Sequence, residues 1–519
     1  MNFRTGILLF LLLMLQNNSV VFAQQQSKEL ISKFYKDPDI EINTPGMNKT
    51  QGFMKYDEMM NYLEEMHVKR QDIFRIGFCG VSNGNKKIPV IFIGKENVPN
   101  PLRIWMQGGL HGNEPAGTES VLMFISFLMQ SDKLDRILDE LSFAFIPMAN
   151  IDGYEKQQRD NENNVDLNRD QVTLEEKESQ FLKQAFTGFS PHVAVDFHEF
   201  RPFRKELEAF SSQKLCISQD VLFLPSGNLN IPLPLRMLTS NLFLKNIKES
   251  LDVNNLTFGD YFIPATDEKG IHFLQMGGDS PRSSSTSYGL ANAVSVLFEI
   301  RGIGLEHNSY KRRVYAGFLI ARSAMETALT HKEKVLNTIH KAVTTTIKRK
   351  NQIVLNSVPE IYSGTMNFID TEKCEIFPIQ VQIRDTWKSK PVAVRERPSG
   401  YIVRPEYSTI ISKLKTLGVK ADTLKHDQNL PVEVFVENGT NPGNVESSHF
   451  GLSKQFRFIP SGSFLISTAQ PNANFIISTL EPEMENGYYR YKMIRKNETG
   501  EIPVYRFHSS KNYYRRLIK

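Results

Sequence analysis

Short apolar runs alternate with longer amphipathic stretches from about residue 54 to residue 345. Apolar runs bounded by turn residues predict buried strands at 73–78, 88–93, 102–106, 143–147, 193–197 and 294–300. Apolar residues that recur at helical spacing predict helices at 117–131, 173–186 and 236–251, and one or two long helices over 314–347. Strands that alternate with helices are typical of an α/β domain, so we expect a mixed, mostly parallel sheet with helices on both faces.

Two local signals refine this picture. Asn83-Gly84-Asn85 separates the first two predicted strands, and this type of sequence favours a hairpin turn. Thr173 and Glu176 have the spacing of a capping box, which predicts that the second helix begins at that point.

The character of the sequence changes after residue 350. Residues 379–383 and 432–434 alternate apolar with polar side chains, while 456–466 and 488–494 are rich in aromatic and branched residues, all of which predict strands. A single helix is indicated around 410–417, with Gly418 as its C-terminal cap. We therefore interpret 54–345 as one domain and 350–519 as a smaller, mainly β accessory domain.

The N-terminus has the pattern of a secretory signal peptide. Arg4 precedes nine apolar residues at 7–15, and Val21-Phe22-Ala23 stands before three glutamines. Nine apolar residues are too few to cross a bilayer, which takes about 20. We expect removal of residues 1–23, a lead-in segment over 24–53, a secreted or periplasmic protein, and no stable insertion in a membrane.

Composition narrows the function classes. The 519 residues are 40% hydrophobic, which excludes a disordered chain. Lys and Arg number 62 against 57 Asp and Glu, so the net charge of +5 does not favour a nucleic-acid partner. With three cysteines, an exported chain cannot depend on a disulfide framework.

The first candidate chemistry is His111-Gly112-Asn113-Glu114, which follows the predicted strand 102–106. A His and a Glu three residues apart can both turn toward one metal ion. His198 ends the strand that begins at Val193, and alternation places Asp196 on the same side of that strand. Two His and one Glu with an open fourth position are a known catalytic zinc set.

Further polar groups follow other predicted strands. Asn150-Ile151-Asp152-Gly153 comes after 143–147, and Arg159 precedes Asn168-Arg169. A guanidinium presents paired donors that match a carboxylate, so Arg169 could bind one. Glu299 lies in an apolar strand, where a carboxylate is costly unless it faces a polar site or a partner. These groups lie at the carboxyl ends of strands, where open α/β sheets bind ligands.

Taken in order, the motifs resemble the signature of the zinc carboxypeptidase family, which includes carboxypeptidases A, B and T. That signature is His-x-x-Glu, Asn-x-Asp-Gly, an Arg ahead of Asn-Arg, a third ligand His and a Glu in a late strand. This chain shows it as His111…Glu114, Asn150…Gly153, Arg159, Asn168-Arg169, His198 and Glu299. The resemblance covers roughly residues 54–330 and is closer to the bacterial members.

The resemblance implies a role for each matching residue. His111, Glu114 and His198 would hold one zinc ion per chain, and Asp166 would orient the ring of His111. Glu299 would be the general base that takes a proton from the zinc-activated water.

On the substrate side, the resemblance implies that Arg159 stabilises the oxyanion and that Asn168 and Arg169 hold the terminal carboxylate. The expected substrates are the C-termini of peptides or proteins. The family often has a tyrosine on a loop before the catalytic Glu. Here that loop is Gly/Ser-rich, with Arg282 and Tyr288 as candidate substrate contacts.

Two other functions stay open. Related zinc amidohydrolases, which deacylate N-acyl amino acids, also use His-Gly-Asn-Glu and a similar Asn-Arg pair. A non-catalytic binding protein on the same fold is the third hypothesis, although such relatives usually lose a ligand or the base. The sequence does not assign the side-chain specificity, the oligomeric state or the role of 350–519.

Overall fold

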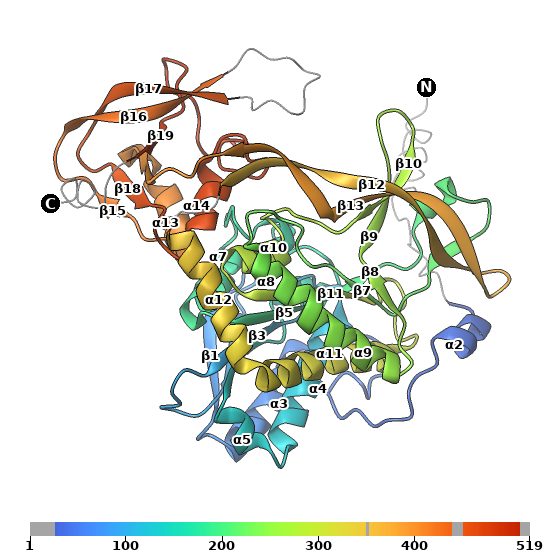
Figure 1. The fold of residues 1–519 in the computed structure, drawn as a ribbon. Coiled ribbons are helices and arrows are strands. Elements are labelled where there is room, and N and C mark those ends of the chain that lie inside the picture. The colour runs from blue at the N-terminus through green and yellow to red at the C-terminus, as the bar shows by residue number, and fades with distance from the viewer. Residues whose placement is uncertain (1–25, 349–351, 438–449, 509–519) are drawn as a thin grey trace, which may run out of the picture.

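The computed structural model describes residues 26–348, 352–437 and 450–508. The signal peptide predicted for 1–23 lies outside these residues. An eight-stranded sheet forms the centre of the first part of the chain, in the order β1-β2-β4-β3-β5-β11-β7-β8 (Figure 1). Its strands are β1 (Phe74–Val81), β2 (Lys87–Ile93), β3 (Leu102–Gln107), β4 (Leu141–Ile146), β5 (Val193–Phe200), β7 (Val221–Phe223), β8 (Phe258–Asp260) and β11 (Val294–Arg301).

The middle of this sheet is parallel. β4, β3, β5 and β11 pair in parallel, and antiparallel pairs join β1 to β2, β2 to β4 and β11 to β7. The predicted hairpin is confirmed, since β1 and β2 pair antiparallel across the Asn83–Asn85 turn. Every residue of β5 is buried, as expected for a strand covered on both faces.

Helices cover both faces of the sheet. On one face, α4 (Pro115–Gln130) and α11 (Tyr310–Thr330) lie together, and Ser120 Oγ donates to the Val314 carbonyl at 3.1 Å. On the other face, Phe186 of α7 (Lys177–Phe189) packs edge-on against Trp105 and stacks on Tyr288 of α10 (Ser284–Leu290). The expected α/β architecture with a β-rich C-terminal part is confirmed.

The predicted helices are present with shifted ends. The helix expected at 117–131 is α4, and the stripe over 314–347 forms α11 and α12 (Lys332–Ile347). The segment 236–251 is divided among α8 (Leu233–Leu238), the π-helical turn η3 (Thr239–Leu244) and α9 (Lys245–Val253).

The capping box expected at Thr173 is wrong. The helix α7 begins at Lys177, because the Asp170 carboxylate binds the preceding turn. It accepts hydrogen bonds from Thr173 Oγ1 at 2.6 Å and from the backbone N–H groups of Glu175 and Glu176 at 2.8 Å each. Thr173 is therefore engaged by Asp170 instead of capping a helix.

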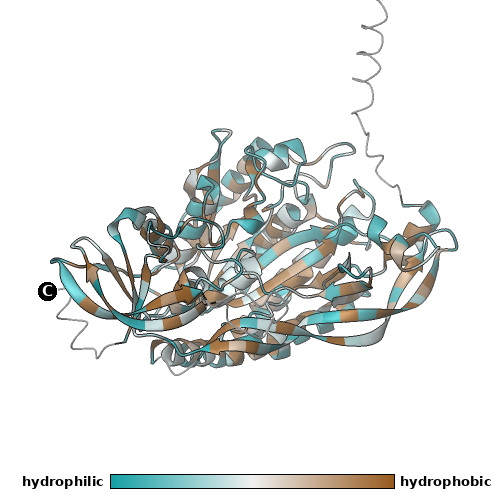
Figure 2. Cartoon of the chain, turned by 90° about the horizontal axis from the view of Figure 1, so that it is seen from above, coloured by the Kyte–Doolittle hydropathy of each residue, from teal (hydrophilic) through white to brown (hydrophobic). Residues whose placement is uncertain are grey.

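A second sheet has the order β6-β12-β13-β10-β9, and its long hairpin crosses the top of the molecule in Figure 1. Its strands are β6 (Leu215–Ile217), β9 (Phe262–Thr266), β10 (His272–Met276), β12 (Ile353–Asp370) and β13 (Glu375–Arg395). Figure 2 shows bands of hydrophilic and hydrophobic residues along the long strands. Because β12 pairs with β6 and β13 with β10, backbone hydrogen bonds link residues on either side of position 350.

The C-terminal part carries a third sheet, in the order β15-β18-β14-β19-β16-β17. Its strands are β14 (Gly400–Val403), β15 (Asp422–Thr423), β16 (Gln428–Glu437), β17 (Phe450–Ile459), β18 (Phe464–Ser467) and β19 (Val504–Phe507), and its helices are α13 (Ser408–Thr416) and α14 (Ala473–Leu480). The predicted helix near 410–417 is thus confirmed as α13, with Gly418 at a φ of 78° just after it.

The strand expected at 488–494 is wrong. This segment forms turns in which the N–H groups of Met493 and Ile494 both donate to the Tyr488 carbonyl. Tyr488 is fully buried, and its hydroxyl donates to the carbonyl of Val172 in the α/β part of the chain. The aromatic residues that suggested a strand instead pack against another part of the molecule.

The remaining helical segments lie at the ends and in the connections. They are α2 (Lys28–Phe34), α3 (Tyr56–Lys69), α5 (Leu134–Leu138), α6 (Ile151–Lys156), η1 (Leu167–Arg169), η2 (Lys205–Ala209) and η4 (Pro405–Tyr407). One apolar core runs from the central sheet into the C-terminal part, because Trp105 and Tyr401 belong to the same buried cluster. Among the described residues, no helix combines the length and the apolar character needed to cross a membrane.

Candidate metal centre and substrate site

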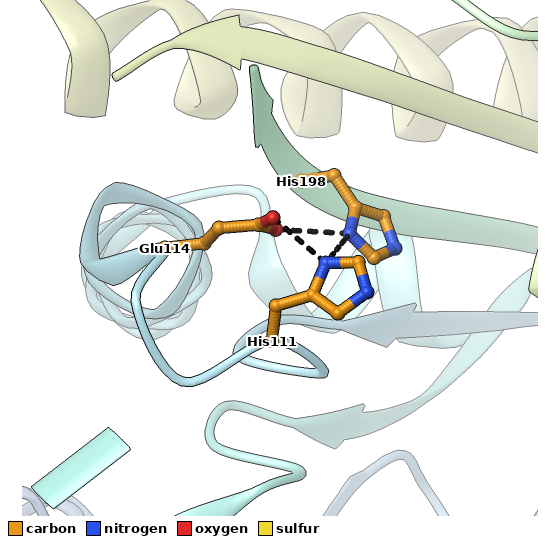
Figure 3. Close-up of side chains that lie close together, drawn as sticks. All are labelled: His111, Glu114 and His198. Carbon is orange, nitrogen blue, oxygen red and sulfur yellow. Dashed lines mark hydrogen bonds and ion pairs between the residues drawn. The ribbon is translucent and has the colours of Figure 1, made fainter. Parts of the chain in front are cut away.

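Three side chains from different elements converge at the carboxyl end of the central sheet (Figure 3). His111 lies in the turn between β3 and α4, Glu114 stands at the N-cap position of α4, and His198 lies on β5. A Cβ at Gly112 would lie 2.0 Å from the backbone carbon of Gly153, so only glycine permits this close contact with the start of α6. Gly112 therefore allows the Asn150–Gly153 motif to pack directly against the 111–114 turn.

The donor atoms of these residues fit one small cation. Glu114 places its two carboxylate oxygens 2.7 Å from His111 Nδ1 and 2.9 Å from His198 Nδ1, and the two Nδ1 atoms are 3.0 Å apart. All three residues are buried, and one ligand atom from each lies within 4.8 Å of the others. Two imidazole nitrogens and a carboxylate are the ligand set of a catalytic zinc site.

Two aspartates contact the ring nitrogens that lie away from the metal position. Asp166 Oδ1 is 3.2 Å from His111 Nε2, and Asp196 Oδ2 is 3.2 Å from His198 Nε2. Each carboxylate accepts the outer N–H of its ring, so the Nδ1 atom is left to face the metal position. Asp166 is the residue that the family resemblance paired with His111. No role was predicted for Asp196, although strand alternation already put it on the side of His198.

Arg159 lies next to this cluster. Its Nε and one terminal nitrogen donate to Asp166 Oδ2 at 3.1 and 2.8 Å, and its other terminal nitrogen is 3.7 Å from Glu114 Oε1. Burial raises the pKa of Asp166, but the hydrogen bond and charge of His111, with the charges of Arg159 and Arg169, outweigh it and hold that pKa well below its usual range. Arg159 is thus a fixed cation at the edge of the metal cluster.

Asn150 explains how Arg159 is placed. Its Oδ1 caps α6 by accepting from Gly153 N at 3.0 Å, while its Nδ2 donates to the Arg159 carbonyl at 3.2 Å. Asp152 of the same motif accepts from Ser82 Oγ and from Gly84 N of the β1–β2 turn, so it is engaged with the scaffold.

Asn168 and Arg169 form the short helix η1 beside the cluster. Asn168 Oδ1 accepts from Ser284 N at 2.7 Å, and its Nδ2 is 3.5 Å from His198 Nε2. Arg169 donates to the Asn168 carbonyl at 2.9 Å and is exposed. Asn168 therefore lies against the predicted ligand His198, and the charge of Arg169, the next residue, lowers the pKa of Asp166.

Glu299 lies on β11 and is the register partner of His198 on β5. Residues paired in parallel strands point to the same face, so its carboxylate lies on the side of the metal cluster. Burial raises the pKa of Glu299 above its usual value, and the charge of Glu114 adds to this, while His198 acts in the opposite direction.

The two predicted contacts on the Gly/Ser-rich loop differ in position. Arg282 is partly exposed, and its Nε donates to the Arg169 carbonyl at 2.6 Å, so it lies directly beside η1. Tyr288 is only 2% exposed and stacks on Phe186, with the Lys183 ammonium 4.8 Å from its ring centre. This burial does not favour a substrate contact for Tyr288, because its ring is part of the core.

Tyr261 was missed by the sequence reasoning. It lies between β8 and β9, and burial raises its pKa to about 12, with the charge of Glu299 as the next cause. The cations of Arg204, Arg169 and Arg159 act in the opposite direction, so this tyrosine shares the surroundings of the catalytic candidates. No motif marks it, because β8 and β9 are short and were not predicted.

Known proteins are similar in sequence to this chain. A family model described as zinc carboxypeptidase matches residues 59–212. Carboxypeptidase 2 of Trichophyton rubrum is 31% identical over 444 residues, covering 82% of this chain and 81% of that protein. The chain belongs to the zinc carboxypeptidase family. It is a metallocarboxypeptidase, and its His-Glu-His cluster accordingly fits zinc.

A second fungal carboxypeptidase is similar over the same share of the chain. Carboxypeptidase 2 of Trichophyton tonsurans is 30% identical over 443 residues, with 82% of this chain and 81% of that protein covered. A metallo-carboxypeptidase structure from Burkholderia cenocepacia has a TM-score of 0.41 and 14% identity, covering 53% of this chain and 70% of that one. The matches to the two fungal carboxypeptidases are longer than the part of the chain before residue 345, so they extend into the C-terminal β-rich region.

Proposed function

We propose that this metallocarboxypeptidase hydrolyses the last peptide bond of peptides that have a free C-terminal carboxylate. The observation that carries the proposal is that Asn168 lies beside His198 of the metal cluster, with Arg169 next to it on the same short helix. An amide donor and a guanidinium on one short turn suit a carboxylate, because both of its oxygens can accept hydrogen bonds. A free C-terminus bound there would bring the adjoining peptide bond toward the metal ligands.

Zinc, when bound, supplies a Lewis acid that polarises the scissile carbonyl and lowers the pKa of water. Residues of the chain carry out the proton transfers and stabilise the developing charge. Glu299 accepts a proton from the attacking water and later donates it to the leaving amine. Its partly buried setting favours this exchange, because burial raises the pKa of the Glu299 carboxyl above its ordinary value. Arg159 donates to the oxyanion that develops on the carbonyl oxygen.

The hydrogen bonds of Arg159 to Asp166 support its part in this scheme. A guanidinium held by two hydrogen bonds to one carboxylate oxygen does not have to reorganise as charge develops. Arg159→Lys would keep the charge but lose the paired geometry, and we expect kcat to fall by about 10² to 10³.

A comparison of substrates tests the proposed function. Purified holoenzyme is assayed with peptides that have a free C-terminus, with the same peptides amidated, and with N-acyl amino acids. We expect cleavage of the free peptides and little cleavage of the amides. Cleavage of the N-acyl amino acids alone would show an amidohydrolase instead, and equal cleavage of free and amidated peptides would rule out the carboxylate contact.

We also propose that the protein is exported. The basic and apolar pattern of residues 1–23 supports this. N-terminal sequencing of protein recovered outside the cytoplasm should begin at Gln24, and recovery of an intact N-terminus from the cytoplasm would contradict export.

A further inference from the structure

The turn that follows Arg169 is anchored by the C-terminal part of the chain. The Lys413 ammonium, on α13, donates to the carbonyls of Thr173 and Leu174, at 2.7 Å in each case. The hydroxyl of Tyr488 donates to the carbonyl of Val172 at 3.2 Å. Three successive carbonyls of the turn that follows Arg169 are thus bound by residues that lie more than 200 positions later in the sequence.

The donors themselves are well fixed. α13 packs beside α7 (Figure 1), and its Ile410, Ile411 and Leu414 are buried in the main core. Tyr488 is fully buried. Both donors therefore sit on packed elements and do not reach the turn from mobile surface segments.

A second set of contacts links Arg169 to the C-terminal part of the chain. Arg282 Nε donates to the Arg169 carbonyl at 2.6 Å, and the Arg282 guanidinium lies 4.8 Å from the centre of the Tyr491 ring. Tyr491 lies three residues after Tyr488 in the C-terminal part. The backbone on either side of Asp170 is therefore held by contacts that involve the C-terminal region.

We propose that Lys413 and Tyr488 are positioning residues for the carboxylate-binding pair Asn168 and Arg169, and that the C-terminal region thereby sets the affinity for substrate. The inference rests on the proposed function, since it assumes that this pair binds the terminal carboxylate. Neither residue touches substrate or metal; each acts on the backbone of the turn. A pair that must present its donors together loses affinity when its backbone shifts.

The expected kinetic signature is a change in KM without a matching change in kcat. The metal ligands and Glu299 lie on β5, on β11 and in the turn between β3 and α4, whereas Lys413 and Tyr488 bind carbonyls of residues 172–174. Loosening the 170–176 turn should weaken the contact with the carboxylate in the ground state and in the transition state alike. Such uniform binding appears in KM.

The test compares three variants of the full-length holoenzyme. Lys413→Met removes both hydrogen bonds, Lys413→Arg keeps a donor, and Lys415→Met changes an exposed residue of the same helix. We expect Lys413→Met to raise KM for a free-carboxylate peptide about tenfold, with kcat within about twofold of the wild type. Lys413→Arg should restore part of the affinity, and Lys415→Met should have no effect.

A second probe separates positioning from general damage. Acetohydroxamate binds zinc and has no carboxylate, so its inhibition constant should be the same in wild type and Lys413→Met. An unchanged KM, or a KM and an inhibition constant that rise together, would overturn the inference. If Lys413→Met does not fold, Tyr488→Phe removes a single hydroxyl and should raise KM in the same direction; an unchanged KM in that variant would also overturn it.

Failure of the proposed function is recognised separately, in the wild type. If the unmodified enzyme cleaves amidated and free peptides equally well, Asn168 and Arg169 do not bind a carboxylate, and both proposals fail. If the wild type requires the free carboxylate and the Lys413 variant behaves identically, only the positioning inference fails.

Discussion

His198 and Glu299 are register partners on the neighbouring parallel strands β5 and β11. Because both residues lie on paired strands, the sheet fixes the relative position of a predicted metal ligand and the proposed base. Side chains on the interior strands of a sheet are more precisely placed than side chains on loops.

Glu299→Gln keeps the size of the side chain and removes its ability to accept a proton. We expect kcat to fall by about 10² to 10⁴, the range attributed to general base catalysis. Zinc content should stay at about one ion per chain, because Glu299 is outside the ligand cluster. Steady-state kinetics with metal analysis would check this, with the exposed Glu333→Gln as the control. A variant with undiminished kcat would contradict the role of Glu299.

The pH profile should reflect the setting of Glu299. Its pKa is raised by burial, and the base is active as a carboxylate, so kcat/KM should fall as the pH drops through that raised pKa. We expect the acidic limb to be centred above pH 4.5, the ordinary value for a glutamate. The measurement is kcat/KM from pH 4 to 9, with retained zinc verified at each pH. A limb at or below 4.5 would contradict the prediction.

Asp196 should contribute to zinc affinity through His198. Asp196→Asn removes the negative charge that accepts the ring N–H at 3.2 Å, and loss of such a partner typically lowers metal affinity about 10- to 100-fold. Competition with a chelator of known zinc affinity would measure the change. Asp132→Asn, at an exposed position, is the matched control. Equal affinity in wild type and Asp196→Asn would show that the contact does not act on the metal site.

Much of the catalytic end of the sheet was predictable, because its residues follow local rules. Strands buried on both faces stand out as apolar runs, and His198 and Glu299 are polar exceptions within two of them. The His111 and Glu114 pair was recognisable from its spacing. These predictions needed only residues close in sequence and the rule that ligands bind at the carboxyl ends of strands.

The relation between the α/β part and the C-terminal part was not predictable in this way. Tyr488 suggested a strand by composition, yet its side chain is used in a contact with Val172, a residue far earlier in the chain. The pairing of β13 with β10 likewise joins segments about 110 residues apart. Periodicity reports which face of an element is buried and not what covers it, so long-range partners of this kind have no local signal.

The buried carboxyl of Glu119 makes the stability of the protein depend on pH. Glu119 of α4 is fully buried; one carboxylate oxygen accepts from Gly46 N at 3.0 Å, and the other has no hydrogen-bond partner among the described residues. Burial raises the pKa of Glu119 to about 7. The folded protein therefore keeps a proton that the unfolded chain releases near pH 4.5. Stability is lost as the pH rises from 4.5 to 7, and the full cost is present above pH 7.

Glu119→Gln remains neutral at every pH and avoids this cost. We expect the variant to be more stable than the wild type at pH 8, by up to about 3 kcal/mol, which corresponds to a Tm a few degrees higher. At pH 5 the two proteins should differ little. Thermal melts at both pH values would check this, with Glu64→Gln, an exposed change, as the control. A difference between variant and wild type that is the same at both pH values would show that Glu119 does not titrate in this range.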